Sequence, residues 1–201
     1  MVVSHRKKCI FIHIPKTAGT SIEQFIKDDN KNDLEYLGVR GNRSMHHFTA
    51  LELKMELKYI FDLYYKFSIV RNPYDRLLSE YYWTPIPNVG FKAGKSKFEF
   101  LNYVADTVKN KKYFDNIYND HFIPQHQFLF NNKKLLVNEV FKYEDLSRAS
   151  DYLKKKLNIE KELPYLNNSK LNIKKDYWNL RQKERIYKLY KNDFIIFNYE
   201  K

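Results

Sequence analysis

Two stretches of the chain share one pattern, an apolar run that stops abruptly and gives way to helical periodicity. Residues 8–14 are apolar and β-branched up to Pro15, and residues 65–70 repeat this pattern up to Arg71. Each run predicts a buried strand, and the apolar spacing that follows is typical of a helix. Strand–loop–helix units in series favour an α/β fold, a central and largely parallel sheet flanked by helices.

The remaining pattern predicts further helices and short strands between polar loops. Helices are predicted at residues 49–59, 97–110, 113–120, 147–157 and 176–191. Strands are predicted at residues 35–39 and 135–141, and loops in the polar stretches 28–45, 84–96 and 161–173. The chain has 201 residues. We expect one domain over 1–201, since roughly 100–200 residues per domain is usual.

Residues that cap helices stand where the two strand–helix units turn. Thr20 or Ser21 is expected to cap the first helix through its hydroxyl oxygen. Asn72 is expected to cap the second, with Pro73 at the first helical position and Asp75 complementing the helix dipole. Both helices are therefore predicted to begin directly beside the carboxyl end of a strand, where ligands bind in α/β sheets.

Composition and charge narrow the class of protein. The chain is 43% hydrophobic and 17% aromatic, which excludes a disordered basic tail. It carries 36 Lys and Arg against 24 Asp and Glu, a formal charge of +12. Most of the basic residues are dispersed lysines, which are weak evidence for nucleic acid but favour any anionic partner, such as a nucleotide, a sulfated glycan, RNA or a membrane.

The cysteine count and the lengths of the apolar runs indicate where in the cell the protein is expected. Cys9 is the single cysteine of the chain, so no intramolecular disulfide and no cysteine-based zinc cluster can form. Apolar runs stay well below the roughly 20 residues that span a bilayer, and the first one is too short for a secretory signal. We expect a soluble, cytoplasmic protein without a membrane span.

The first strand–helix turn has the chemistry of a phosphate-binding loop. A helix N-terminus offers unpaired N–H groups and a positive dipole end, and Gly19 permits close approach of the backbone. Lys16 adds a charge, and Thr17, Thr20 and Ser21 add hydroxyl groups. The segment is not a Walker A motif, because its lysine precedes the glycine instead of following it. The alternative is a turn that only caps a helix.

The second turn carries a second group suited to phosphate. Arg71 stands where the strand ends, and its planar guanidinium can hold a phosphate in two places. Ser79 lies about two helical turns beyond Pro73, where its hydroxyl can share that phosphate. Arg76, inside the helix, is expected to pair with Asp75 or Glu80 on the surface instead.

Together, FIHIPKTAGTS and FSIVRNPYDRLLSEYY resemble the paired nucleotide-binding motifs of sulfotransferases that use 3′-phosphoadenosine 5′-phosphosulfate (PAPS), in the carbohydrate (Golgi-type) branch grouped as sulfotransferase family 2. Similar blocks follow at residues 47–50, 120–125, 141–146, 163–169 and 189–199, so that the resemblance covers nearly the whole chain. It implies a P-loop-like sulfotransferase fold.

The resemblance also implies site residues. The first loop would bind the 5′-phosphosulfate, and Lys16 would stabilise charge on the departing phosphate oxygen. Arg71 and Ser79 would bind the 3′-phosphate, and Ser169 would close over the nucleotide from a late loop. The first loop consists of Pro15, Lys16, Thr17, Ala18, Gly19, Thr20 and Ser21.

A base must take the proton of the acceptor hydroxyl, and the resemblance implies His47. An unperturbed imidazole titrates near 6.5, so it can accept a proton at neutral pH. His46 is the first alternative, and Glu23 and Glu52 are further ones.

The other histidines and a group of aromatic residues have more than one interpretation. His13 is expected to pack in the core, whereas His121 and His126 either line the acceptor site or belong to a structural loop. No HExxH pairing or cysteine partner supports a zinc site, and no metal is expected. The aromatic residues Tyr81, Tyr82 and Trp83 stack on a ligand or pack in the core.

The hypothesis from the sequence is an enzyme that moves a sulfuryl group from PAPS to a hydroxyl. The acceptor is a sugar or glycan, and the nucleotide product is adenosine 3′,5′-bisphosphate (PAP). A P-loop-type phosphotransferase is one alternative, although the Gly-Lys-Ser/Thr ending is missing. A non-enzymatic module that binds RNA or an acidic glycan is the other. No specific nucleic acid is expected as a partner, and the sequence leaves the oligomeric state open.

Overall fold

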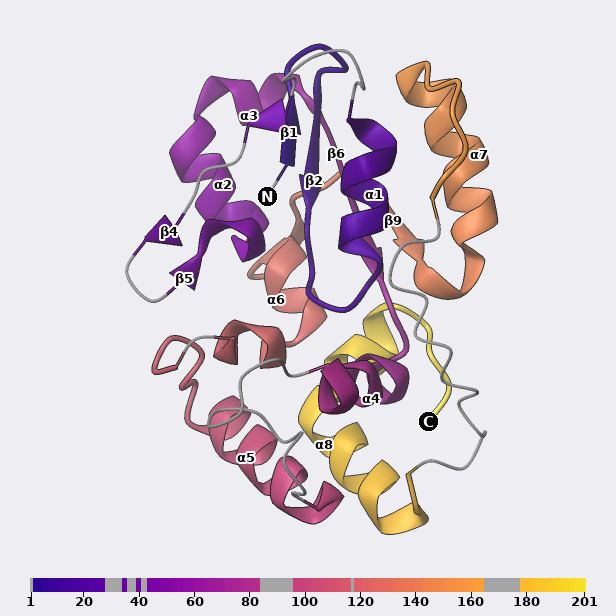
Figure 1. Cartoon of the computed structure of the whole chain (residues 1–201). Helices are drawn as coiled ribbons and strands as arrows, with labels where there is room; N and C mark the ends of the chain where they lie inside the picture. The colour runs from indigo at the N-terminus through magenta and orange to yellow at the C-terminus, as the bar shows by residue number, and fades with distance from the viewer. Residues whose placement is uncertain are drawn as a thin grey trace.

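A computed structural model describes residues 2–27, 34–35, 39–40, 43–83, 96–116, 118–164 and 178–201. A five-stranded sheet of order β3-β1-β2-β6-β9 runs through the upper half of the molecule in Figure 1. Its strands are β1 (Val2–Ser4), β2 (Cys9–Ile12), β3 (Leu34–Glu35), β6 (Tyr65–Val70) and β9 (Glu139–Lys142). Two separate hairpins pair β4 (Val39–Arg40) with β5 (Arg43–Ser44) and β7 (Phe130–Asn131) with β8 (Lys134–Leu135).

The sheet is mixed, with a parallel centre. β2, β6 and β9 are parallel neighbours, with Phe11 opposite Phe67 and Phe67 opposite Glu139. The predicted parallel arrangement is therefore confirmed for these strands. β1 and β3 add an antiparallel edge, and β1 was not predicted because three residues are too few to show an alternating pattern.

Helices cover both faces of the parallel strands, which explains why β2 and nearly all of β6 are buried. Ile10 and Ile12 of β2 point to the face covered by α2, α3 and α6, whereas Phe11 points to the opposite face, under α1 and α7. These helices are α1 (Gly19–Ile26), α2 (Ala50–Leu57), α3 (Tyr59–Leu63), α6 (Gln125–Leu129) and α7 (Leu146–Leu157).

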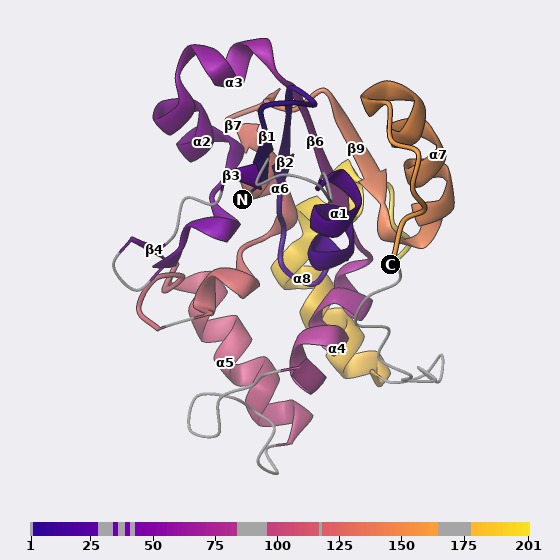
Figure 2. The same ribbon diagram turned by 45° about the horizontal axis from the view of Figure 1, so that its top comes forward.

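A third group of helices lies beyond the carboxyl ends of β2 and β6, in the lower half of Figure 1. α4, α5 and α8 enclose their own apolar cluster, which includes Leu77, Phe100 and Ile186. Figure 2 shows the same grouping after a 45° turn. Their bounds are α4 (Pro73–Trp83), α5 (Lys97–Lys109) and α8 (Leu180–Ile196). The site described below therefore lies between the sheet and this helical layer.

Several predicted elements differ from the observed ones. The helix predicted at 113–120 is wrong: Tyr118 takes a left-handed backbone with φ 70°, and a short 3-10 helix follows at Asn119–Phe122. The strand predicted at 135–141 is divided between β8 and β9. The last helix begins at Leu180, where Asn179 forms a capping box with Gln182.

The strand predicted at 35–39 is also divided, between β3 and β4. Much of the predicted loops at 84–96 and 161–173 lies outside the described residues. Among the residues that the structure describes, no helix combines the length and the apolar character needed to cross a membrane.

Candidate active site

The loop between β2 and α1 is held in an unusual backbone conformation. Lys16 and Ala18 both have φ 69°, in the left-handed region that non-glycine residues seldom adopt. The buried Thr17 donates its hydroxyl to the carbonyl of Ile14 at 2.8 Å, which closes the turn from within. The hydroxyl proton of Thr17 is therefore already used within the loop. Strain of this kind is typical of ligand-binding loops.

The N-terminus of α1 lies directly behind this loop. The helix begins at Gly19, and Ala18 is its N-cap without any side-chain hydrogen bond, so the predicted cap at Thr20 or Ser21 is wrong. Thr20 is exposed and Ser21 is buried. Because no side chain caps this end, its N–H groups and positive dipole end are available for an anion.

Gly19 is required by its neighbour His13. A Cβ atom at position 19 would lie 1.8 Å from Nε2 of His13, well inside contact distance. Nδ1 of His13 pairs with Glu23 at 2.9 Å, and burial lowers the pKa of His13. His13 is thus largely buried, as expected, and its ring also lies against Gly19, the first residue of α1.

Lys16 projects beside an aromatic ring. Its Nζ lies 4.2 Å from the centroid of Trp83, a cation–π contact. Burial, with a smaller contribution from Arg71, lowers the pKa of Lys16 to about 8, although the nearby Glu80 acts in the opposite direction. Lys16 therefore remains mostly charged at neutral pH and loses its proton more readily than a surface lysine.

Arg71 reaches the same loop from the end of β6. Its Nη1 donates to the carbonyl of Lys16 at 3.3 Å, and the guanidinium lies 4.0 Å from the ring centroid of Tyr143. Its backbone N–H donates to Gln125, which also holds the Arg71 carbonyl. Nε of Arg71 is buried and has no hydrogen-bond partner among the described residues. A buried donor without a partner is costly, which is consistent with a ligand that supplies the acceptor.

The structure thus brings the two predicted loops together, with Lys16 and Arg71 in contact across neighbouring strands. Asn72 caps α4 as predicted, accepting from the N–H of Tyr74 at 2.9 Å. Ser79 is half-buried in α4. Ser169 lies outside the described residues, together with Asn168 and Lys170.

Arg76 corrects the expectation of a surface ion pair. It is 3% exposed, and its guanidinium donates to three backbone carbonyls, those of Pro15, His121 and Ile123, at 2.7–3.1 Å. Arg76 therefore connects the loop between β2 and α1 to the segment around His121. A basic residue in a helix with acidic neighbours gave no sign of this role, because its acceptors are backbone atoms 45–61 residues away.

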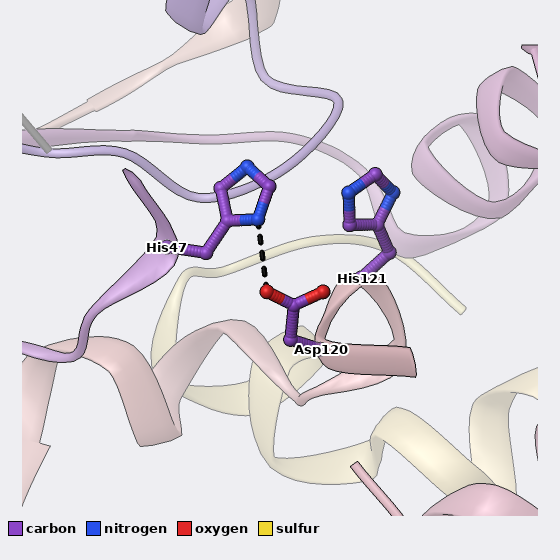
Figure 3. Close-up of side chains that lie close together, drawn as sticks. All are labelled: His47, Asp120 and His121. Atoms are coloured by element: carbon purple, nitrogen blue, oxygen red, sulfur yellow. Dashed lines mark hydrogen bonds and ion pairs between the residues drawn. The ribbon is translucent and has the colours of Figure 1, made fainter. Parts of the chain in front are cut away.

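Figure 3 shows a cluster of His47, Asp120 and His121. Nδ1 of His47 lies 3.0 Å from a carboxylate oxygen of Asp120, and the imidazole centroids of His47 and His121 are 4.9 Å apart. Nδ1 of His121 lies 2.8 Å from the carboxylate of Glu80. Each imidazole is therefore held by its own buried carboxylate.

These carboxylates fix the tautomers. A carboxylate accepts a hydrogen bond, so Nδ1 of each ring carries the proton and Nε2 keeps its lone pair. Burial lowers the pKa of His47 to about 3, while the hydrogen bond to Asp120 acts in the opposite direction. Both rings can accept a proton at Nε2, as a general base must.

The other base candidates are less suited to that role. Burial raises the pKa of Glu23, but hydrogen bonds from His13 and His46 outweigh it and hold this pKa well below its usual range. Glu52 closes the N-terminus of α2 in a capping box with Thr49. His46 lies 3.9 Å from Glu23, and its side chain is 37% exposed.

The remaining predicted residues divide between the site and the core. Trp83 stacks on His121, with the ring centroids 5.2 Å apart, and also contacts Lys16. Its ring therefore lies between the loop that follows β2 and the cluster of His47, Asp120 and His121. Tyr81 packs against Phe100 in the helical layer. His126 pairs with the fully buried Asp193 at 2.6 Å, a structural role.

Sequence reasoning missed the carboxylates that hold the imidazoles. Asp120 pairs with a residue 73 positions away, and Glu80 with one 41 positions away. The one signal was that Asp120 and His121 stand together in a segment already noted as a possible wall of the acceptor site.

Three comparisons with known proteins bear on the family of this chain. A search of curated proteins and a search of solved structures each found no match. A family model described as "Sulfotransferase family" matches residues 1–200, and hence nearly the full length. Its match bears out the resemblance to sulfotransferase family 2 and the single α/β fold. The chain therefore belongs to the sulfotransferase family, whose general chemistry is sulfuryl transfer.

Proposed function

We propose that this sulfotransferase moves the sulfuryl group of PAPS to a hydroxyl group of a carbohydrate acceptor. The observation that carries the proposal is the meeting of Lys16 and Arg71 at the carboxyl ends of β2 and β6. A buried imidazole held by Asp120 lies within the same site. Such an arrangement combines anion binding with a base, the two requirements of sulfuryl transfer from a nucleotide.

In this proposal the nucleotide lies across both loops. The loop from Pro15 to Ser21 and the N-terminus of α1 bind the 5′-phosphosulfate through backbone N–H groups. Arg71 binds the 3′-phosphate, with Nε as one of its donors, and Ser79 and Ser169 add hydroxyl groups. The cosubstrate PAPS leaves as PAP, and no step uses a metal ion.

The reaction is an in-line displacement at sulfur. The acceptor oxygen forms a bond to sulfur while the bond from sulfur to the phosphate oxygen breaks. Nε2 of His47 takes the proton of the hydroxyl, and Asp120 stabilises the imidazolium. Lys16 stabilises the negative charge that develops on the departing phosphate oxygen.

Nucleotide binding supplies the tuning that His47 needs. In the free protein burial lowers its pKa to about 3, which keeps the imidazole neutral but makes it a weak base. A nucleotide with several negative charges beside the ring favours the protonated form and raises the pKa of His47. The base therefore becomes effective when the sulfuryl donor is in place.

Thermal shift with three ligands tests the proposal against its alternatives. PAP at a hundredfold excess over its Kd should stabilise the chain by about 2.7 kcal/mol. ATP with Mg²⁺, the ligand of a phosphotransferase, and single-stranded RNA, the ligand of a basic binding module, should give a smaller shift. Arg71→Met should lose most of the PAP shift, and Arg181→Met, far along the chain in α8, should keep it. A shift with ATP or RNA and none with PAP would reject the proposal.

A further inference from the structure

The cluster of His47, Asp120 and His121 also has the composition of a metal site. Each residue offers one ligand atom, and these atoms all lie within 4.8 Å of one another. The side chains are 12%, 6% and 3% exposed, in that order. They come from two 3-10 helices, Met45–His47 and Asn119–Phe122, which Arg76 and the pair of His47 with Asp120 hold in place.

An independent observation points to a ligand at this cluster. Nε2 of His121 is buried and has no hydrogen-bond partner among the described residues. In Figure 3 a ring nitrogen of His121 faces the ring of His47. The opposite nitrogen, Nδ1, is held by Glu80 at 2.8 Å. An imidazole with one nitrogen on a carboxylate and the other unpartnered is the arrangement that metal-binding histidines adopt.

We propose that His47, Asp120 and His121 bind a divalent transition-metal ion of the zinc type. Nδ1 of His47, one oxygen of Asp120 and Nε2 of His121 are the ligands, and water takes a fourth position. Two nitrogens and one oxygen suit zinc, whereas magnesium and calcium prefer oxygen alone.

Nearby charge limits the affinity of this site. The carboxylates of Asp120 and Glu80 attract a cation, while Lys16 and Arg76 repel it. These four formal charges cancel. We therefore expect micromolar binding instead of the much tighter binding of structural zinc sites.

Metal binding changes the tautomer of His47. Without metal, the proton is on Nδ1 and Nε2 has the lone pair. When Nδ1 donates its lone pair to the ion, the proton moves to Nε2, and Asp120 exchanges its hydrogen bond for a metal bond. Nε2 can then no longer accept a proton. This consequence rests on the proposed function: zinc should inhibit sulfuryl transfer by removing its base.

Calorimetric titration of the full chain with ZnCl₂ at pH 7 tests the binding itself. The wild type should bind one ion. His121→Asn keeps a donor for Glu80 but loses Nε2, and it should bind zinc more than tenfold more weakly. Glu80→Gln should weaken binding about tenfold, since partners of metal ligands matter by about 10–100-fold. His126→Asn, which removes a histidine that also pairs with a buried carboxylate, should bind zinc like the wild type.

Equal zinc affinity in the wild type and His121→Asn would overturn the proposal. Should the variants fail to fold, the wild type alone decides: Co²⁺ should give visible absorption of a four-coordinate site, and its absence at saturating Co²⁺ would equally overturn the proposal. PAP binding in the presence of zinc separates this inference from the proposed function. PAP should bind with or without zinc, so a chain that binds zinc and not PAP contradicts the function alone.

Discussion

The two ends of the site handle charge in opposite ways. At the nucleotide end, Lys16 lies in the loop before α1, Arg71 donates to the carbonyl of Lys16, and Nε of Arg71 lacks an acceptor within the described chain. At the imidazole end, His47 and His121 are each held by a buried carboxylate. The first end is built to receive negative charge from outside. The second end supplies its own negative charge, and burial lowers the pKa of His47 so that its ring stays neutral.

Because of this difference, we expect each end to have a different role in the reaction. In the proposed reaction, the excess of positive charge at the first end binds the anionic donor and stabilises the departing phosphate oxygen. An imidazole with a fixed tautomer accepts a proton. Trp83, in contact with both Lys16 and His121, links the two ends. Variants at the two ends should therefore fail in different ways.

The largest expected effect is at the imidazole end. His47→Asn keeps a donor for Asp120 but removes the base, and it should lower kcat by about 10²–10⁴-fold, the usual contribution of general base catalysis. PAP affinity should stay within about twofold, because the phosphate contacts are at the other end. Release of PAP from PAPS measures the first quantity, and calorimetry the second. If His47→Asn keeps full turnover while His121→Asn loses it, the base belongs at His121.

The next largest effect is at the nucleotide end. Lys16→Met should lower kcat by about 10²–10³-fold, as is typical when one group that stabilises developing charge is removed. Lys58→Met, on an exposed lysine of the α2–α3 junction, is the matched control and should leave kcat unchanged. An effect on the KM for PAPS alone would reduce Lys16 to a binding residue.

The pH profile sharpens the assignment of Lys16. Its pKa is lowered to about 8, so its charged form is lost as pH rises through about 8. The value of kcat/KM should therefore fall above that pH, by about tenfold per unit. Arg stays protonated at every accessible pH, so Lys16→Arg should remove this limb. An unchanged limb in Lys16→Arg would assign it to another group.

A pair of arginines separates binding from stability. Arg71→Met should weaken PAP binding by about 10–100-fold, since each hydrogen bond to a charged group contributes about 1.5–3 kcal/mol. Arg76→Met leaves three backbone carbonyls without their donor, and the free energy of unfolding should fall by about 3 kcal/mol or more. Calorimetry measures PAP binding, and urea unfolding measures the free energy of unfolding. A loss of stability in Arg71→Met together with a loss of PAP binding alone in Arg76→Met would contradict these assignments.

The smallest expected effect concerns the link between the two ends. Trp83→Leu keeps an apolar side chain but loses the cation–π contact with Lys16, a contact that typically contributes about 0.5–2 kcal/mol. We expect a loss of kcat of roughly 2–30-fold, with PAP affinity nearly unchanged. Trp178→Leu, in the helical layer, should instead affect stability. A loss for Trp83→Leu as large as that for Lys16→Met would mean that Trp83 touches the substrate.

Local sequence was sufficient for the nucleotide end. Lys16 and Gly19 stand in one turn after a buried strand, and Arg71 follows a second buried strand, so order and spacing placed each group at the carboxyl end of a strand; the structure shows that the two strands are neighbours. The strand Tyr65–Val70 and the start of the following helix at Pro73 were predicted to the residue, because an apolar run and a Pro-started helix are local signals.

The imidazole end could be predicted only in part. His47 followed from the family resemblance, but Asp120 and Glu80 did not, because their partners are far away in sequence. Arg76 was assigned to the surface for the same reason, since its acceptors are backbone carbonyls that carry no side-chain signal. A helix was predicted over Asp120, where the left-handed Tyr118 breaks the backbone.

A crystal structure of the chain with PAP tests the central claim most directly. The 5′-phosphate should lie at the N-terminus of α1 beside Lys16, and the 3′-phosphate should accept hydrogen bonds from Arg71, including Nε. His47 should remain on Asp120, with Nε2 facing the position where the sulfuryl group would be. A nucleotide bound elsewhere, or with neither phosphate on Arg71, would contradict the account.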